Sequence, residues 1–155
     1  GVRAGWSGSW GLRGKAGADT LKGNNGRDDL HGAKDSDSLD GGNGADVLSG
    51  GKDADAFVFS TKLSKKNVDR ITDFGKGADI IQLDSAIFTK LGPEGELASA
   101  QFTKGSKAKG SAGQIVYDHG SGKIYYAKHG DDGGSKLFAK VDKGTDLHHG
   151  DFFIV

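Results

Sequence analysis

The chain has 155 residues, including 28 glycines and a single proline, and its 21 basic and 21 acidic residues leave no formal net charge. It has no cysteine, which excludes disulfide bridges and thiol chemistry. The lysines are scattered, and no apolar run approaches the roughly 18 residues of a membrane span, so we expect neither nucleic-acid binding nor stable membrane insertion.

Six nine-residue units run back to back over residues 5–58. Each unit has glycine at its first place, and all but the first have aspartate at the sixth, where the first has Trp10. The eighth place always holds a large apolar residue: Leu12, Leu21, Leu30, Leu39, Leu48 and Phe57. A fixed period of this kind predicts a repeat architecture in which each unit is a turn followed by a short strand with one inward side chain.

Two units make one full coil, so the turns of alternate units are expected to stack. One stack would hold Trp10, Asp28 and Asp46, and the other Asp19, Asp37 and Asp55. Carboxylates stacked at the strand spacing of roughly 4.8 Å repel one another unless a cation lies between them. Calcium fits, because it binds carboxylate and carbonyl oxygens. A flexible acidic linker, the alternative, would not need an apolar residue at every ninth position.

Strand patterns recur after the repeats, with turns between them. The expected strands are 56–60, 68–74, 80–83, 114–118, 123–128 and 136–141, and the last three form a meander. Segments 85–90 and 96–102 are mixed in pattern, and 104–113 is a loop rich in lysine and glycine. Asp131 and Asp132, in the turn before the last of these strands, are a weak candidate metal site.

The six units resemble the G-G-x-G-x-D-x-U-x repeats of RTX proteins, the hemolysin-type calcium-binding family. The segment that begins DRITDF at Asp69 also resembles the region that follows the last repeat in that family. The resemblance, which extends to serralysin-like exoproteins and alginate epimerase R-modules, implies an all-β fold. Residues 5–58 would form a parallel β-roll, and residues 59–155 a C-terminal β-sandwich that caps it.

The resemblance also implies a set of calcium ligands. In the family, each ion is bound between two successive turns of a stack. The first turn supplies the carbonyls of places one and three and its aspartate. The next turn supplies the carbonyls of places two and four and its aspartate. One site would then consist of Gly14, Ala16, Asp19, Ala33, Asp35 and Asp37. A second would consist of Gly32, Lys34, Asp37, Gly51, Asp53 and Asp55. A third would consist of Gly23, Asn25, Asp28, Gly42, Gly44 and Asp46. This gives about three calcium ions.

The units depart from the family pattern at several places. Trp10 removes one acid, so a site between the first and third units should be weak or absent. Asp35 and Asp53 replace glycine at place four, where a left-handed backbone is tolerated by aspartate at some cost. Lys34 and Lys52 bring positive charge near the proposed ions, although their long side chains can reach solvent.

Three further acids follow the last repeat. Asp69 matches a family acid that completes a calcium site with the last turns, which would raise the count to four ions; a surface strand position is the alternative. Asp73 and Asp79 are expected to be turn and capping acids rather than ligands.

The chain ends in Asp151 followed by four apolar residues. This ending resembles the C-terminal signal of many proteins exported by type I ABC transporters, and it is also the pattern of a buried strand. The resemblance implies a secreted, extracellular protein in which residues 151–155 direct export and calcium drives folding outside the cell. The calcium ion and the transporter are the expected partners.

No catalytic motif stands out. There is no H-E-x-x-H, no G-x-S-x-G and no complete phosphate-binding loop, so we do not expect this chain to be an enzyme by itself, although a catalytic domain could precede it. The alternative function is that of a polysaccharide-binding accessory module of a secreted carbohydrate-active enzyme. The scattered lysines and five aromatic residues leave that alternative open: Trp6, Trp10, Tyr117, Tyr125 and Tyr126.

Overall fold

The computed structural model describes residues 1–130 and 134–155, so Asp131 and Asp132, proposed as a weak metal site, lie outside the described residues. Apart from two short 3-10 helices, η1 (Ser99–Gln101) and η2 (His149–Asp151), its regular structure consists of strands in two sheets. Within the described ranges, no helix has the length and hydrophobicity needed to cross a membrane. The predicted all-β class is confirmed.

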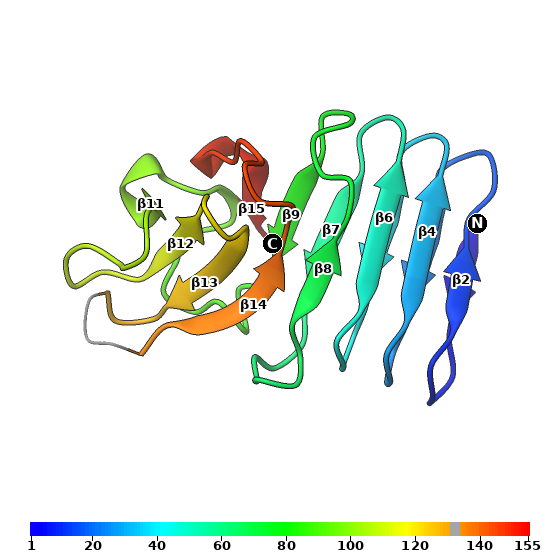
Figure 1. Ribbon diagram of the computed structural model, residues 1–155, viewed down its shortest axis with the longest axis horizontal. Helices are drawn as coiled ribbons and strands as arrows, with labels where there is room; N and C mark the ends of the chain where they lie inside the picture. The colour runs from blue at the N-terminus through cyan, green and yellow to red at the C-terminus, as the bar shows by residue number, and fades with distance from the viewer. Residues whose placement is uncertain (131–133) are drawn as a thin grey trace.

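The N-terminal half is a parallel β-roll in which the chain alternates between the two sheets (Figure 1). One sheet contains β2 (Gly11–Arg13), β4 (Asp29–Ala33), β6 (Val47–Gly51) and β8 (Asp69–Ile71). The other contains β1 (Val2–Ala4), β3 (Thr20–Lys22), β5 (Ser38–Asp40), β7 (Ala56–Phe59) and β9 (Ile80–Leu83). Strand β1, which pairs with β3, precedes the first predicted unit.

The apolar residues of place eight form the core of the roll. Leu30 lies between Leu12 and Leu48 in one sheet, and Leu39 lies between Leu21 and Phe57 in the other. This register confirms that two units make one coil. All of these side chains are fully buried except Leu12, which is half-buried because its coil is the first.

The roll continues beyond the six predicted units. Ile71 of β8 pairs with Leu48, and Ile81 of β9 pairs with Phe57, and both isoleucines are fully buried. Segments 64–72 and 74–82 therefore take the places of two further units. An inserted segment, 59–63, separates them from the last repeat, and serine and phenylalanine replace the glycine of place one. The division into domains at residue 58 stays a prediction.

The C-terminal part extends both sheets without a break. The sheet that ends in β8 continues through β14 (Lys136–Lys140), β13 (Lys123–Ala127), β12 (Gln114–Asp118) and β11 (Phe102–Lys104). The other continues from β9 through β15 (Phe152–Ile154) to β10 (Gly95–Glu96). Strands β12, β13 and β14 are antiparallel neighbours, which confirms the predicted meander. One core cluster runs from the leucines of the roll to Phe138 and Phe152.

One predicted strand is shorter in the structure, and the predicted C-terminal strand is present. The strand expected over 68–74 ends at Ile71. Asp73 lies in the turn that follows, where its side chain accepts hydrogen bonds from Gly50 N (3.0 Å) and Gly51 N (2.9 Å) of the last repeat. The final apolar residues form β15, parallel to β9, with Phe152 and Ile154 buried. The buried-strand interpretation of the C-terminus is confirmed.

Candidate calcium-binding turns

The aspartates of place six form two ladders, one on each edge of the roll. In each ladder, the Oδ1 atom of one aspartate accepts a hydrogen bond from the backbone N of the residue at place six in the preceding coil. The distances are 2.8 Å (Trp10 to Asp28), 2.7 Å (Asp28 to Asp46) and 3.0 Å (Asp46 to Asp69) in one ladder, and 2.8 Å (Asp19 to Asp37), 2.9 Å (Asp37 to Asp55) and 3.0 Å (Asp55 to Asp79) in the other.

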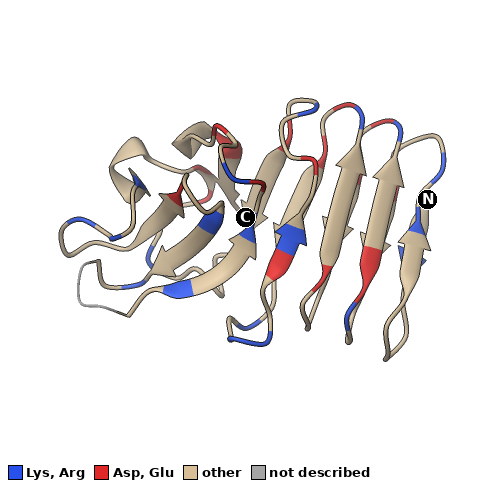
Figure 2. Cartoon of the chain, in the orientation of Figure 1, with Lys and Arg blue, Asp and Glu red and all other residues tan. Residues whose placement is uncertain are grey.

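We call the turns around Trp10, Asp28, Asp46 and Asp69 turn stack 1, and those around Asp19, Asp37, Asp55 and Asp79 turn stack 2. Figure 2 shows acidic residues in the turns at the edge of the roll. The predicted composition of both stacks is confirmed for the six repeats. Each stack also gains one acid from the segments after the repeats.

The two added acids differ in their contacts. Asp69 accepts a hydrogen bond through Oδ1 from Asp46 N. Asp79 accepts hydrogen bonds through both oxygens, with Oδ1 bonded to Asp55 N and Oδ2 to Gly75 N (2.7 Å). The register of Asp79 was missed from the sequence, although a signal was present. The turn GKGAD at residues 75–79 repeats GKDAD at residues 51–55 with one substitution. An offset of 24 residues, in place of the 18 between repeats, hides the match.

The ladders leave three carboxylate oxygens buried without a hydrogen-bond partner: Oδ2 of Asp28, Asp37 and Asp46. These three residues are at most 3% exposed. A buried carboxylate oxygen without a partner is costly, and a cation placed beside it removes that cost. Three hard oxygens of this kind, repeated along the stacked turns, fit calcium.

The glycine of place one holds each turn close to its own aspartate. A Cβ atom on Gly32 would lie 2.4 Å from Asp37 Oδ2, and one on Gly41 would lie 2.4 Å from Asp46 Oδ2. In these repeats a side chain at this place would therefore push the carboxylate away. A Cβ atom on Gly32 would also lie 2.6 Å from Gly50 O, so the glycine leaves room for both the carboxylate and a backbone carbonyl of the next coil.

Burial makes these acids hard to ionise while no cation is bound. It raises the pKa of Asp28, Asp37 and Asp46, only partly opposed by the backbone hydrogen bonds that each accepts. Burial also raises the pKa of Asp55 to about 6 and that of Asp69 to about 8. A bound cation would reverse this effect, because it favours the charged carboxylate.

Asp19 lies at the N-terminal end of turn stack 2. Its Oδ2 atom accepts a hydrogen bond from Lys15 N (2.8 Å), and this contact favours the charged carboxylate.

Place four has a left-handed backbone in all six units. The φ angles are +127° (Gly8), +91° (Gly17), +131° (Gly26), +69° (Asp35), +141° (Gly44) and +76° (Asp53). The two aspartates adopt the conformation expected for them, and hydrogen bonds offset its cost. Asp35 Oδ2 accepts from Gly17 N (2.7 Å), and Asp53 Oδ2 accepts from Asp35 N (3.1 Å).

Turn stack 1 joins its coils with neutral amides instead. Asn43 Nδ2 donates to Asn25 Oδ1 (3.0 Å), and Gly44 N donates to Asn67 Oδ1 (2.7 Å). Asn67 occupies place four of the unit 64–72, so it continues the stack with an uncharged side chain. The two stacks therefore have the same register but carry different charge.

A calcium ion in these turns would need backbone oxygens as well as carboxylates. Among the described residues, no group of three or more His, Asp or Glu side chains could hold a metal ion by itself. The residues predicted to give carbonyl ligands lie in the same stacked turns: Gly14, Ala16, Gly23, Asn25, Gly32, Ala33, Lys34, Asp35, Gly42, Gly44, Gly51 and Asp53.

Some of these carbonyls already accept a hydrogen bond, including Asn25 O from Gly8 N (2.9 Å) and Ala33 O from Lys52 N (3.2 Å). A carbonyl oxygen has two lone pairs, so one hydrogen bond leaves room for a second contact.

Comparison with known proteins agrees with this geometry. A family model described as the RTX calcium-binding nonapeptide repeat, in four copies, matches residues 12–39 and 23–57. No curated protein matches the chain.

The chain is also similar to two solution structures of subunits of the Azotobacter vinelandii mannuronan C5-epimerase. For the AlgE6R3 subunit the identity is 24% and the TM-score 0.60, over 94% of this chain and 78% of that one. For the AlgE6R2 subunit the identity is 20% and the TM-score 0.60, over 99% and 91%. These likenesses show the fold, and the description of the matched repeats as calcium-binding comes from the family model. Residues 12–57 of the roll therefore match the RTX calcium-binding nonapeptide repeat.

Proposed function

We propose that this chain is a calcium-triggered folding module of a secreted protein. Three calcium ions occupy the three ligand sets implied by the family resemblance, and a fourth lies between Asp46 and Asp69. The observation that carries the proposal is the set of buried carboxylate oxygens without partners, Oδ2 of Asp28, Asp37 and Asp46. The fourth site is supported by the register of Asp69, which continues the ladder of turn stack 1.

Calcium binding and folding are linked through these acids. Without the ion, folding buries carboxylates whose raised pKa values show that their charged forms are disfavoured. With the ion, which supplies the opposite charge, the same burial becomes favourable. A ligand at about 100 times its dissociation constant stabilises the folded state by about 2.7 kcal/mol per site. The module is therefore loosely folded at low cytosolic calcium and compact outside the cell.

Residues 151–155 serve as the type I export signal in this proposal. In the folded protein, Phe152 and Ile154 are at most 2% exposed, because β15 lies between β9 and β10. A transporter can contact these side chains only before the C-terminal part has folded. Export through a narrow channel and late folding on calcium therefore require the same unfolded state.

The folding proposal is tested by circular dichroism of the chain in chelator and in calcium. We expect little β-structure in chelator and a cooperative gain at roughly micromolar to millimolar calcium. Magnesium should do much less, because it demands a tight octahedral shell. Identical spectra in chelator and in calcium would refute the proposal.

The export proposal is tested by deleting residues 151–155 in cells that carry a matching type I transporter. We expect the truncated chain to remain inside the cells. Calcium-induced folding of the truncated chain, followed by circular dichroism, controls for damage to the β15 strand. Normal secretion of the truncated chain would place the signal elsewhere.

A second function, that of a polysaccharide-binding accessory module, is favoured by a specific observation. The two similar structures are subunits of a mannuronan epimerase, and a group of lysines borders two cavities in the C-terminal part. Of the aromatic residues considered for this function, Tyr117 and Tyr126 are buried in the core and are not available. Titration of the calcium-loaded protein with acidic oligosaccharides tests the function.

A further inference from the structure

The asparagines of this chain are confined to one edge of the roll. All four lie in turn stack 1, and turn stack 2 has none: Asn24, Asn25, Asn43 and Asn67. Asn25 and Asn43 occupy place three of their units, and each is followed directly by a glycine. Both side chains are exposed to solvent. Two exposed Asn-Gly pairs therefore lie in neighbouring turns of the same stack.

An Asn-Gly pair can react with itself. The backbone nitrogen of the glycine attacks the side-chain carbon Cγ of the asparagine, and a C–N bond forms. The amide group takes up the proton that this nitrogen loses and leaves as ammonia. Water then opens the succinimide ring at one of its two carbonyls and gives aspartate or isoaspartate. Glycine makes the attack easiest, because it has no Cβ atom to crowd its nitrogen or restrict its backbone.

In the folded roll, both attacking nitrogens are already engaged in hydrogen bonds. Gly26 N donates to Asn43 O (2.9 Å), and Gly44 N donates to Asn67 Oδ1 (2.7 Å). The attack removes the proton that each of these hydrogen bonds uses, so the hydrogen bond must break first. Reaction in the folded state therefore has to wait for a local opening of the turn.

The side chains that would be attacked are held as well. Asn43 Nδ2 donates to Asn25 Oδ1 (3.0 Å), which ties the two amides to each other. Asn25 and Asn43 also pair as an isolated parallel bridge, and Gly8 N donates to Asn25 O (2.9 Å). The turns stack so closely that a Cβ atom on Gly44 would collide with Gly26 O. Neither pair is free to bend into a five-membered ring while the coils are stacked.

We propose that Asn25 and Asn43 are deamidation sites that the folded roll protects, and that the chain is modified there while it is free of calcium. The second half of this inference rests on the folding switch proposed above, because only a chain that is loose without calcium leaves both pairs free to react. Asn24 and Asn67 are followed by asparagine and valine, whose side chains crowd the attacking nitrogen, so these two should stay intact.

The modification would reach the third proposed ligand set, which includes Asn25 and Gly44. In isoaspartate the main chain runs through the side-chain carbonyl, so the backbone carbonyl of Asn25 becomes a free carboxylate and the turn gains one carbon atom. The aspartate product keeps the backbone carbonyl in place. Loss of the ion in the third set should therefore follow the isoaspartate content, while turn stack 2, which has no asparagine, keeps its ions.

The test follows deamidation of the whole chain at one mildly alkaline pH in three solutions: excess calcium, chelator, and urea with chelator. Peptide mapping by mass spectrometry measures, at each asparagine, the mass gain from the exchange of NH2 for OH. We expect Asn25 and Asn43 to react at similar rates in chelator and in urea. In calcium both should react at least about tenfold more slowly, because the reaction then depends on rare openings of the folded turns.

Calorimetry then measures the ion count of the chain that has been deamidated in chelator and returned to calcium. We expect the natural sequence to lose the ion of the third set. The variant with Asn25→Gln and Asn43→Gln, in which the amide would have to close a larger ring, should keep its ion count after the same treatment. The variant with Asn25→Ser and Asn43→Ser is a second unreactive control without the extra methylene of glutamine.

The outcomes separate the sites from the folding switch. Equal rates at Asn25 in calcium and in urea would overturn the protection, and reaction at Asn24 or Asn67 as fast as at Asn25 would overturn the assignment of the sites. A slow reaction in chelator and calcium alike, with a fast one in urea, would refute the folding switch and leave two sites protected by the fold. An unchanged ion count in a chain rich in isoaspartate would overturn the link to the third ligand set.

Discussion

Turn stacks 1 and 2 join their successive coils in the same register but with different side chains. Both continue the hydrogen-bond ladder of place six from coil to coil. Stack 1 adds contacts between neutral amides, such as Asn43 with Asn25, whereas stack 2 adds the carboxylates of Asp35 and Asp53. Two turns of stack 2 therefore hold two acids each, Asp35 with Asp37 and Asp53 with Asp55.

This difference teaches that the backbone of the roll does not require the extra charge. Neutral side chains hold the turns of stack 1 in the same register as carboxylates hold those of stack 2. The additional acids of stack 2 raise the electrostatic cost of folding without a cation and increase the gain when one binds. We therefore expect stack 2 to be the more calcium-dependent edge of the roll.

The largest effect is expected for an acid shared by two proposed sites, which is Asp37 in stack 2 and Asp46, a member of the third ligand set and of the fourth site, in stack 1. Asp37 is shared by two of the three ligand sets, whereas Asp19 belongs to one, so Asp37→Ala should lose two ions and Asp19→Ala one. At calcium concentrations about 100 times the dissociation constant, the loss of two sites removes roughly 5 kcal/mol of stabilisation. The lost ions also offset neighbouring carboxylates, so the effects should exceed a simple sum.

Calorimetric stoichiometry of the two variants measures this difference, and Asp28→Ala serves as the comparison in stack 1. In that stack the absence of an acid at Trp10 leaves Asp28 in a single ligand set, so one ion should be lost. Equal loss for Asp19→Ala and Asp37→Ala would mean that the proposed sharing of Asp37 is wrong.

The next effect compares the acids that end the two stacks. Asp69→Asn should lose one ion in calcium, or about 2.7 kcal/mol at 100-fold excess, yet stabilise the fold in chelator because folding no longer requires an acid to be protonated or buried with its charge. Asp79→Asn should leave the ion count unchanged, because Asp79 belongs to none of the proposed ligand sets. Loss of an ion in Asp79→Asn would show that stack 2 binds calcium beyond Asp55.

A smaller, graded effect is expected from pH. The pKa of Asp55 is raised to about 6 and that of Asp69 to about 8, both mainly by burial. A raised folded pKa means that the calcium-free fold is favoured at low pH and loses stability as pH rises from about 4 to about 8. Calcium requires the ionised acids, so its midpoint concentration should instead fall, a few-fold per pH unit, over about the same range. Thermal melts in chelator and calcium titrations at several pH values measure the two opposite trends.

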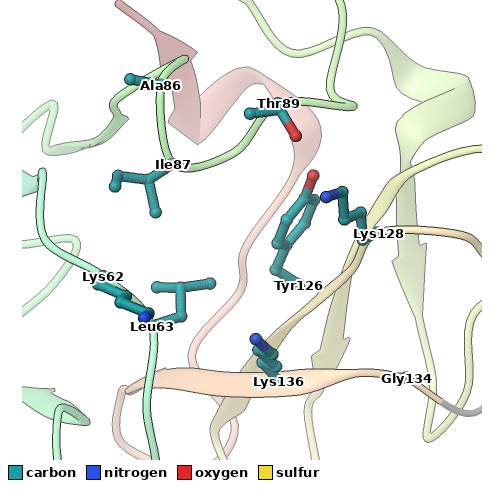
Figure 3. A pocket seen from close by; sticks show the side chains of 9 residues that line it. All are labelled: Lys62, Leu63, Ala86, Ile87, Thr89, Tyr126, Lys128, Gly134 and Lys136. Atoms are coloured by element: carbon teal, nitrogen blue, oxygen red, sulfur yellow. The ribbon is translucent and has the colours of Figure 1, made fainter.

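The periodic part of the fold could be predicted from the sequence, and the rest depended on contacts that a period does not encode. Glycine, aspartate and leucine at fixed places gave the strands, the register and the composition of both stacks. The insertion of residues 59–63 broke the period, so Asp79 was not recognised as a member of its ladder, and Asp69 was placed beside the last turns only through the family resemblance. Likewise, Leu63 and Lys136 are far apart in sequence, and only the folded sheets bring them together in the lining of one cavity (Figure 3).

The smallest expected effect is the gain of one calcium ion. It is expected for a variant in which the first turn of stack 1 receives the aspartate that the turns of stack 2 have at place six. Trp10 stands at place six of the first unit, its backbone N donates to Asp28 Oδ1, and its side chain is 47% exposed, so replacing it costs little packing. Trp10→Asp should add one ion between the first and third units, seen as one more site in calorimetry, while Trp10→Asn should add none. The new site should be weak, because the first coil has no covering neighbour in this sheet and its Leu12 is only half-buried. If Trp10→Asp adds no ion even at high calcium, an aspartate at place six is not enough, and a complete coil on each side must also be needed to hold the turn.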